Sequence, residues 1–404
     1  MNGKERLAVA SAAILALCAA GAHAEKAYGP GVTDTEIKIG QTFAYSGPTS
    51  AYATIARAEA AYFQMVNDRG GINGRKIKFI SVDDAYSPPK TVEQTRRLVE
   101  QEEVLALFTS LGTPTNLAVR KYLNQHKVPQ LFVLSGAASM NDPQNFPWTM
   151  PFIPAYRTEA QAFAAYVTQH FPKARIAALY QNDDFGKDYL QGFKDALGEK
   201  AAQVVAEASY EVTDPTVDSQ IITLKGSGAD TLVTFATAKA GAQAIRKVAS
   251  IGWKPTHFIS YTTASIEAAL KPAGLENAVG LISSQYAKDP SDPRWAADPA
   301  LRDYLAWMKK YYPAGDALDV LNVGGYNYAQ VAVQVLKQCG DDLTRENVLR
   351  QAANLRDLAL PMLRPGITIN TGPADYLPIE QLQMVRFDGR LWVAVGELIA
   401  ARRR

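Results

Sequence analysis

Cysteine is nearly absent from this sequence, which has two among 404 residues, Cys18 and Cys339. Cys18 lies in an apolar N-terminal run, so the rest of the chain holds a single thiol. One thiol excludes an internal disulfide and every zinc site built from several thiolates. Histidine is also scarce, and His126, His170 and His257 are widely separated. We therefore predict no metal site.

The sequence also lacks the short motifs of common catalytic and nucleotide-binding sites. It contains no His-Glu-x-x-His, no Gly-x-Ser-x-Gly, no Walker loop and no Gly-x-Gly-x-x-Gly. The acid pairs at residues 83–84 and 183–184 offer groups for acid–base chemistry. At strand ends, however, such acids more often cap a helix or line a turn. We predict that the protein is not an enzyme, has no catalytic residues and needs no cofactor.

No excess of one charge sign is present, because 42 Lys and Arg stand against 40 Asp and Glu, for a net charge of +2. This balance argues against nucleic acid as the main partner. Beyond the N-terminus, no run is long and apolar enough to suggest a membrane span. The length suits two domains of ordinary size.

The N-terminus has the order of a secretory signal peptide. Lys4 and Arg6 precede an apolar run over residues 7–20, and a small-x-small pattern ends at Ala24. We predict a signal peptide over residues 1–24, cleavage after Ala24 and a periplasmic location. An anchored helix is disfavoured because the run is short. Lipidation of Cys18 is disfavoured because a bulky leucine precedes it.

Short β-rich runs alternate with longer amphipathic segments from residue 37 onward. Strands are expected over residues 37–43, 76–82, 105–109, 130–134, 175–180, 203–208, 231–235 and 257–260. Helices are expected over residues 51–67, 92–102, 117–125, 157–170, 186–197, 300–311, 322–338 and 344–353, and a hairpin over 381–395. This alternation predicts an α/β fold of two lobes, each a mostly parallel sheet flanked by helices, which are separated near residue 150.

Small, hydroxyl-rich turns follow three expected strands of the first lobe, at residues 46–48, 110–116 and 135–139. Open α/β sheets bind ligands at the carboxyl ends of their strands. Small residues let backbone N–H groups approach a ligand, and hydroxyls with helix N-termini then hold an anion. The three turns together predict a carboxylate site in the first lobe.

Several motifs resemble those of a known family. They are residues 37–40, Ser46-Gly47-Pro48, residues 67–74 with the run Gly-Gly-Ile-Asn-Gly, Asp83-Asp84, Gly112-Thr113, Ser135-Gly136-Ala137 and Phe185-Gly186. In these features the chain resembles the Leu/Ile/Val-binding proteins, the branched-chain amino-acid class of periplasmic receptors for ABC importers. The resemblance covers nearly the whole chain after the signal peptide.

The resemblance implies a type I periplasmic-binding-protein fold in which a ligand is held between two closing lobes with hinge crossovers. It places residues 25–151 and 286–366 in lobe one, and residues 152–285 and 367–404 in lobe two. It implies a monomer that delivers a small carboxylate-bearing solute to permease subunits in the inner membrane. The ligand contacts that it implies are Tyr52, Gly112, Thr113, Gly136, Ala137, Ala138, Phe185, Thr262 and Tyr286.

Two departures from the family pattern bear on the ligand. Tyr86 and Leu111 stand where some members carry a disulfide, so that cross-link is absent. Thr262 stands where amino-acid receptors place an acid against the ligand ammonium. A buried ammonium without its partner costs about 3–5 kcal/mol, so the ligand is expected to lack this group. A shifted alignment would instead make Glu267 the acid.

The ligand class therefore stays open between a branched-chain amino acid and an aromatic or other organic acid. Motifs at residues 289–293, 365–371 and 375–379 resemble receptors for organic acids. Two other functions are alternatives: a ligand sensor of the same fold, which the signal peptide disfavours, and an exported hydrolase, which the missing catalytic motifs disfavour.

Overall fold

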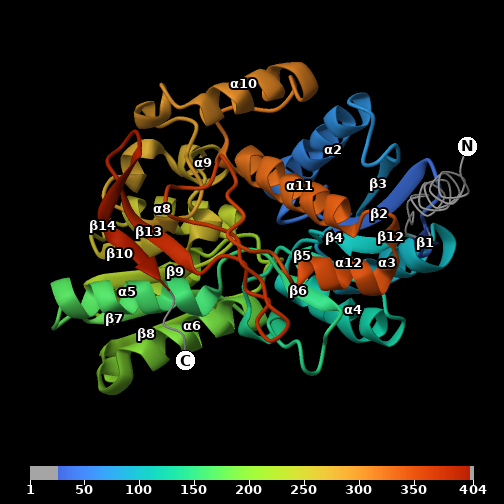
Figure 1. Ribbon diagram of the computed structural model, residues 1–404. Coiled ribbons are helices and arrows are strands. Elements are labelled where there is room, and N and C mark those ends of the chain that lie inside the picture. Colours follow the sequence, from blue (N-terminus) through green and yellow to red (C-terminus); the bar gives the residue numbers. More distant parts are fainter. Residues whose placement is uncertain (1–25, 401–404) are drawn as a thin grey trace, which may run out of the picture.

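Two large sheets organise the computed structural model, which describes residues 26–400, and a small parallel sheet pairs β1 (Ala27–Tyr28) with β12 (Asp342–Leu343). In Figure 1 the first sheet and its helices lie on the right and the second on the left, with crossing segments between them. The predicted two-lobed α/β fold is confirmed. The predicted signal peptide, with Cys18 and Ala24, lies outside the described residues, as do residues 401–404 of the predicted second lobe.

The first sheet has five parallel strands in the order β3-β2-β4-β5-β6. They are β2 (Glu36–Phe43), β3 (Lys76–Asp83), β4 (Ala106–Phe108), β5 (Gln130–Val133) and β6 (Thr149–Pro151). The helices between these strands are α2 (Ala53–Asp68), α3 (Pro88–Arg96) and α4 (Thr113–Gln125). Two later helices, α11 (Val320–Cys339) and α12 (Arg345–Ala352), return to this lobe, and α11 lies beside α2 (Figure 1).

The second sheet has seven strands in the order β14-β13-β11-β10-β9-β7-β8. They are β7 (Ile176–Gln181), β8 (Val204–Tyr210), β9 (Thr231–Phe235), β10 (Thr256–Ile259), β11 (Ile282–Gln285), β13 (Gln381–Phe387) and β14 (Trp392–Ala400). The last two form the predicted antiparallel hairpin, and the other five are parallel. Helix α5 (Tyr156–His170) precedes these strands. The helices between them are α6 (Asp184–Leu197), α7 (Asp218–Gly226), α8 (Ala238–Ser250) and α9 (Lys271–Ala273), and α10 (Pro299–Tyr311) follows the crossing after β11.

Local sequence explains most of these elements. Strand β9 reads Thr-Leu-Val-Thr-Phe and is buried throughout, as expected for a parallel strand covered on both faces. Helix α6 begins where the Asp183 side chain accepts hydrogen bonds from the N–H groups of Phe185 and Gly186. It ends at Gly198, whose φ of 56° suits glycine.

Two helices begin one turn earlier than predicted. Helix α4 starts at Thr113, and the predicted turn over residues 113–116 is therefore its first turn. Helix α3 starts at Pro88 and continues as a π-helical turn to Gln101. Both helices have proline in their first two positions, where its fixed φ and missing N–H are compatible with a helix. Strand β11 and helices α7 and α8 are not among the expected elements.

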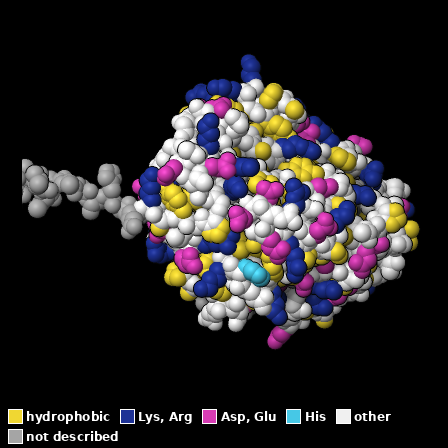
Figure 2. Space-filling model, turned by 90° about the vertical axis from the view of Figure 1, so that its right-hand side faces the viewer, with side chains coloured by type: hydrophobic (Ala, Val, Ile, Leu, Met, Phe, Trp, Pro, Cys, Tyr) yellow, Lys and Arg dark blue, Asp and Glu magenta, His cyan; other side chains and the backbone are white. Residues whose placement is uncertain are grey.

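The chain passes between the two sheets three times over the described residues: between β6 and α5, between β11 and α11, and between α12 and β13. These passages lie near the boundaries predicted for the two lobes, which stay a prediction. No helix in residues 26–400 combines the length and the apolar character that crossing a bilayer requires. On the face shown in Figure 2, Lys and Arg side chains are interspersed with Asp and Glu side chains.

Candidate ligand-binding site

A cavity of about 130 Å³ lies between the two sheets and is bounded by residues from both lobes. This volume admits several water molecules, or a compact organic solute in their place. The walls come from the turns after β2, β3, β4, β5, β7, β9 and β10, the end of β11, the crossing segments after β6 and β11, and the start of α11.

Aromatic rings dominate the cavity wall. They belong to Tyr52, Tyr86, Tyr156, Phe185, Tyr261, Tyr286 and Tyr328. Several of these rings pack edge to face, including Tyr156 on Phe185 at 5.1 Å and Tyr261 on Tyr286 at 5.8 Å between centroids. Among the described residues, no Asp, Glu, Lys, Arg or His lines this cavity. The site therefore offers flat apolar surfaces and neutral polar groups to a ligand.

The tyrosine hydroxyls stay protonated at ordinary pH. Burial raises the pKa of both Tyr156 and Tyr286 to about 12 because it disfavours the phenolate. The hydroxyls of Tyr286 and Tyr328 lie 2.7 Å apart and share a hydrogen bond. In such a pair one phenol donates to the other, and the accepting phenol keeps its own hydrogen for another partner.

Tyr52 reaches across the cavity from the first lobe. Its hydroxyl donates to the carbonyl oxygen of Thr262 at 2.7 Å and accepts from the N–H of Ala238 at 2.8 Å. Both partners are backbone groups of the second lobe. The ring of Tyr52 thus lines the cavity, while its hydroxyl joins the two lobes.

Gly112 lines the cavity at the N-terminus of α4, as predicted for a ligand contact. Its φ is 99°, and a Cβ atom added here would lie 2.3 Å from a ring carbon of Tyr86. Glycine is therefore required for the aromatic wall to approach the helix end. The adjacent Thr113 is buried, and its hydroxyl lies 2.7 Å from that of Ser135.

The turn after β5 lies behind the cavity wall. A Cβ atom on Gly136 would lie 2.2 Å from the carbonyl oxygen of Pro154, in the crossing segment. The N–H of Ala137 bonds the Ser135 hydroxyl, and the N–H of Ala138 bonds the Asp188 carboxylate of α6. Of the nine predicted contacts, Tyr52, Gly112, Phe185, Thr262 and Tyr286 line the cavity, whereas Thr113, Gly136, Ala137 and Ala138 do not. Ligand contact by any of the nine stays a prediction.

The wall contains no acid at position 262, where amino-acid receptors are expected to place one against the ligand ammonium. Thr262 lines the cavity, and its hydroxyl donates to the Ala236 carbonyl at 3.0 Å. Glu267, the alternative acid, is outside the wall and pairs with Lys271 at 2.5 Å. Nothing in the lining is therefore placed to neutralise an ammonium group.

The acid pair at residues 83–84 holds the loop that presents Tyr86, in agreement with its predicted role in a turn. Ala85 and Tyr86 have φ values of 51° and 58°, which non-glycine residues rarely adopt. The Asp83 carboxylate accepts from the N–H of Ala85, and the Asp84 carboxylate accepts from the N–H of Tyr86. Asp183 likewise caps α6 and so positions Phe185.

A buried carboxylate, Glu159 of α5, supports two residues of the wall. It accepts hydrogen bonds from the N–H of Tyr261, from the Ser284 hydroxyl at 2.5 Å and from the Tyr189 hydroxyl at 2.8 Å. Burial raises its pKa to about 7, although these donors favour the charged form. Glu159 thus ties α5 to the turn after β10 and to β11.

Eight polar or aromatic wall residues are not among the sequence predictions: Thr49, Tyr86, Tyr156, Thr237, Tyr261, Ser284, Gln285 and Tyr328. They come from separate segments, and no local pattern marks them. In residues 26–400, no group of three or more His, Cys, Asp or Glu is arranged to hold a metal ion.

Comparison with known proteins agrees with this architecture. The model of a family described as periplasmic binding protein matches residues 36–390. Leu/Ile/Val-binding protein homolog 7 of Brucella abortus (strain 2308) is 23% identical over 297 residues, which cover 70% of this chain and 73% of that protein. Homolog 1 of the same strain is 25% identical over 308 residues, covering 75% of this chain and 77% of that protein.

Solved structures share the fold. A branched-chain amino acid ABC transporter protein from Thermus thermophilus with bound valine has a TM-score of 0.82 at 18% identity, covering 92% of this chain and 98% of that one. A solute-binding protein from R. palustris in complex with 4-hydroxybenzoate has a TM-score of 0.75 at 17% identity, covering 91% and 98%. The family match spans most of the chain, and this chain belongs to the periplasmic binding protein family, whose members are binding proteins and not enzymes.

Proposed function

We propose that this protein is the periplasmic receptor of an ABC importer and that its ligand is a small aromatic carboxylate without an ammonium group. The observation that carries this proposal is the cavity wall, which has seven aromatic rings and no ionisable acid or base among the described residues other than the tyrosines. Aromatic side chains favour a flat ring in stacked or edge-to-face contact. The carboxylate is held by neutral donors.

The missing acid argues against an amino acid as the ligand. An ammonium group buried without its partner loses about 3–5 kcal/mol, which corresponds to roughly 10²- to 10³-fold in affinity. Thr262 offers no charge, and its hydroxyl hydrogen is already used. Relatives of this fold include proteins solved with valine and with 4-hydroxybenzoate. The wall favours the second type of ligand.

The proposal includes closure of two lobes over the ligand. Residues 25–151 with 286–366 form lobe one, and residues 152–285 with 367–404 form lobe two. The placement of β2 to β6 and α11 in one lobe, and of β7 to β11 and β13 in the other, supports these boundaries. The protein acts as a monomer that meets permease subunits at the inner membrane, after removal of residues 1–24.

Thermal unfolding with added ligands tests the proposal. With 4-hydroxybenzoate at a hundredfold excess over its Kd, the folded state gains about 2.7 kcal/mol, so the midpoint rises. Valine and leucine at the same concentration leave the midpoint unchanged. A rise with valine or leucine and none with 4-hydroxybenzoate contradicts the proposal.

A variant sharpens this test. Thr262→Glu places an acid in the wall, so binding of 4-hydroxybenzoate weakens through charge repulsion. Thr223→Glu makes the same change on an exposed position of α7 and serves as the control. Equal binding by both variants would show that residue 262 does not face the ligand.

A further inference from the structure

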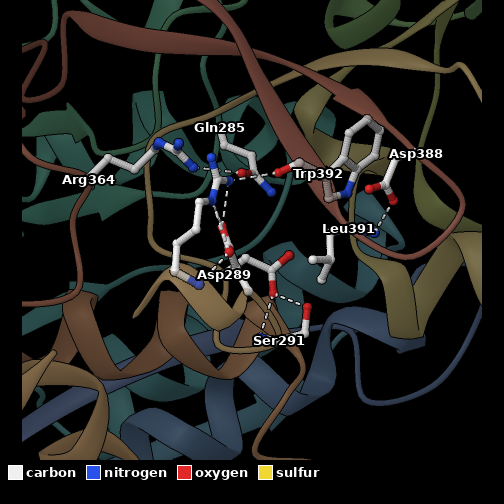
Figure 3. Close-up of polar contacts among 9 residues, drawn as sticks. Gln285, Asp289, Ser291, Arg364, Asp388, Leu391 and Trp392 are labelled. Carbon is white, nitrogen blue, oxygen red and sulfur yellow. Dashed lines mark hydrogen bonds and ion pairs between the residues drawn. The ribbon is translucent and has the colours of Figure 1, made fainter. Parts of the chain in front are cut away.

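A cluster of charged side chains lies behind the cavity wall at the end of β11. Figure 3 shows Arg364 and Gln285 within it, joined by a hydrogen bond from Nη1 of Arg364 to Oε1 of Gln285. The two atoms lie 3.0 Å apart. Arg364 is 7% exposed and lies in the crossing segment between α12 and β13. Gln285 is itself part of the cavity wall.

This contact determines which way the Gln285 amide points. A guanidinium group has donors and no acceptor, so the atom facing Arg364 must be the amide oxygen. The amide nitrogen, with its two hydrogens, then lies at the other end of the group. The two N–H bonds of this nitrogen diverge, so the amide can donate in two directions. Asp289 belongs to the same cluster (Figure 3) and accepts its hydrogen bonds from Ser291.

The acids near Arg364 already have partners. Asp292 is held by Arg294, with Nη2 2.5 Å from Oδ2, and Asp298 is held by Lys288 at 2.5 Å. Asp289 accepts from both the hydroxyl and the N–H of Ser291. No ion pair joins Arg364 to a carboxylate within residues 26–400. Arg364 therefore hydrogen-bonds a neutral amide of the cavity wall, while Asp289 and Asp292 attract its charge from nearby.

We propose that Gln285 donates an N–H to a carboxylate oxygen of the ligand. Arg364 is the positioning residue, because it holds the amide oxygen and so orients the amide nitrogen. The inference rests on the proposed function because it identifies the group that recognises the ligand's carboxylate. Hydrogen bonds to charged acceptors are stronger than those to neutral ones. The site thus prefers an acid to its carboxamide, which has the same shape and no charge.

Calorimetric titration with 4-hydroxybenzoate and 4-hydroxybenzamide tests this preference. In Gln285→Met and Arg364→Met, the affinity for the acid falls about tenfold to hundredfold. The affinity for the amide falls less, so the ratio of the two affinities shrinks. Arg364→Lys keeps part of the ratio because lysine also donates. Arg75→Met removes a buried arginine that bonds Tyr28 and Asp341 at the far edge of the first lobe, and it leaves the ratio unchanged.

Two results would overturn the inference. One is a ratio of acid affinity to amide affinity in Gln285→Met that equals the ratio of the wild type. The other is an equal loss of affinity for the acid and for the amide in Arg364→Met, which would give Arg364 a structural role alone. A crystal structure of the wild-type complex gives a second readout that does not depend on variant folding. It should show Nε2 of Gln285 within hydrogen-bonding distance of a ligand carboxylate oxygen, and a ligand carboxylate bound elsewhere refutes the inference.

Failure of the proposed function is separable from failure of this inference. If the wild type binds valine and not 4-hydroxybenzoate, the proposed ligand class is wrong. The same variants titrated with valine and valinamide then decide the role of Gln285 by the same ratio. A wild-type protein that binds neither acid contradicts both proposals.

Discussion

At the scale of single residues, Glu159 shows how the fold sets the chemistry of a side chain. Its carboxylate is fully buried and has no cationic partner among the contacts described above, yet four hydrogen bonds from three residues reach it. Burial raises its pKa more than these donors lower it, and the result is a pKa of about 7. Nothing in the local sequence around Glu159 indicates this shift.

The raised pKa predicts how stability depends on pH. The folded state holds the Glu159 proton more tightly than the unfolded chain, whose pKa is near 4.5. The contribution of Glu159 to stability is therefore greatest below pH 4.5 and declines as pH rises through about 7, by on the order of 3 kcal/mol. Glu159→Gln removes this titration.

Urea unfolding of wild type and Glu159→Gln between pH 4.5 and pH 8 measures the effect. The difference in free energy of unfolding should move in favour of the variant as pH rises, since glutamine carries no charge to desolvate. A difference that stays constant over this range would mean that Glu159 keeps one protonation state in the folded protein.

For the turns, the sequence predicted where a small residue is needed more successfully than it predicted which group that residue contacts. Gly112 was identified from a small-residue turn, and the structure places it in the cavity wall with a φ that suits glycine. Gly136 was identified in the same way, but its missing Cβ makes room for Pro154 and Tyr156 of the crossing segment. Both glycines allow close approach, and only the three-dimensional packing shows what approaches them.

At the scale of elements, the start of α6 links helix formation to the site. The Asp183 carboxylate caps the helix by accepting from two N–H groups, and the helix then presents Phe185 to the cavity. Asp183→Ala removes the cap and should lower the free energy of unfolding by about 1 kcal/mol. Loosening of the first turn should also weaken ligand binding.

Asp184→Ala is the matched control, because Asp184 is exposed in the first turn and lies outside the cap. It loses only a favourable charge near the helix N-terminus, a smaller effect of about 0.3–1 kcal/mol. Chemical denaturation of both variants at one pH compares the losses. A larger loss in Asp184→Ala would assign the cap to the wrong residue.

Element boundaries depended on signals of different strength. The alternation of strand and helix was clear from residue 37 onward, and most of the predicted elements are present. The starts of α3 and α4 differ from the prediction because each helix has proline in its first two positions, and proline is more typical of turns. Strand β11 was missed because its four residues, Ile-Ser-Ser-Gln, lack the β-branched alternation of the other strands, and its burial comes from neighbouring strands and Glu159.

At the scale of the whole molecule, hydrogen bonds beside the cavity join the two lobes. The Tyr52 hydroxyl bonds two backbone groups of the second lobe. The Ser265 hydroxyl donates to the Asp319 carboxylate, at the start of α11, at 3.0 Å. In the proposed closure, links of about 1 kcal/mol each would let the lobes open and close in response to small changes in free energy.

Tyr52→Phe removes one of these links and keeps the aromatic ring in the wall. The loss of the hydrogen bond to the Thr262 carbonyl should cost about 1 kcal/mol, so the closed form becomes less populated and the ligand dissociates faster by roughly fivefold. Small-angle scattering should show a larger radius of gyration than wild type at the same subsaturating ligand concentration.

Tyr166→Phe, on α5 outside the cavity wall, is the control for loss of a tyrosine hydroxyl. It should leave the radius of gyration and the dissociation rate unchanged. If saturating ligand fails to shrink the wild-type protein itself, closure of two lobes is not how it binds.

The sequence by itself determined the fold class, because hydrophobic periodicity is local and the alternation of strands with helices admits few architectures. It also excluded thiolate metal sites and located glycines that sheet edges require. Only the tertiary structure decided the composition of the cavity, since its rings come from segments that no short-range pattern connects. The orientation of the Gln285 amide is the clearest case, because it depends on Arg364, 79 residues away in the sequence. A hydrogen bond between such distant residues exists only once the crossing segments have packed.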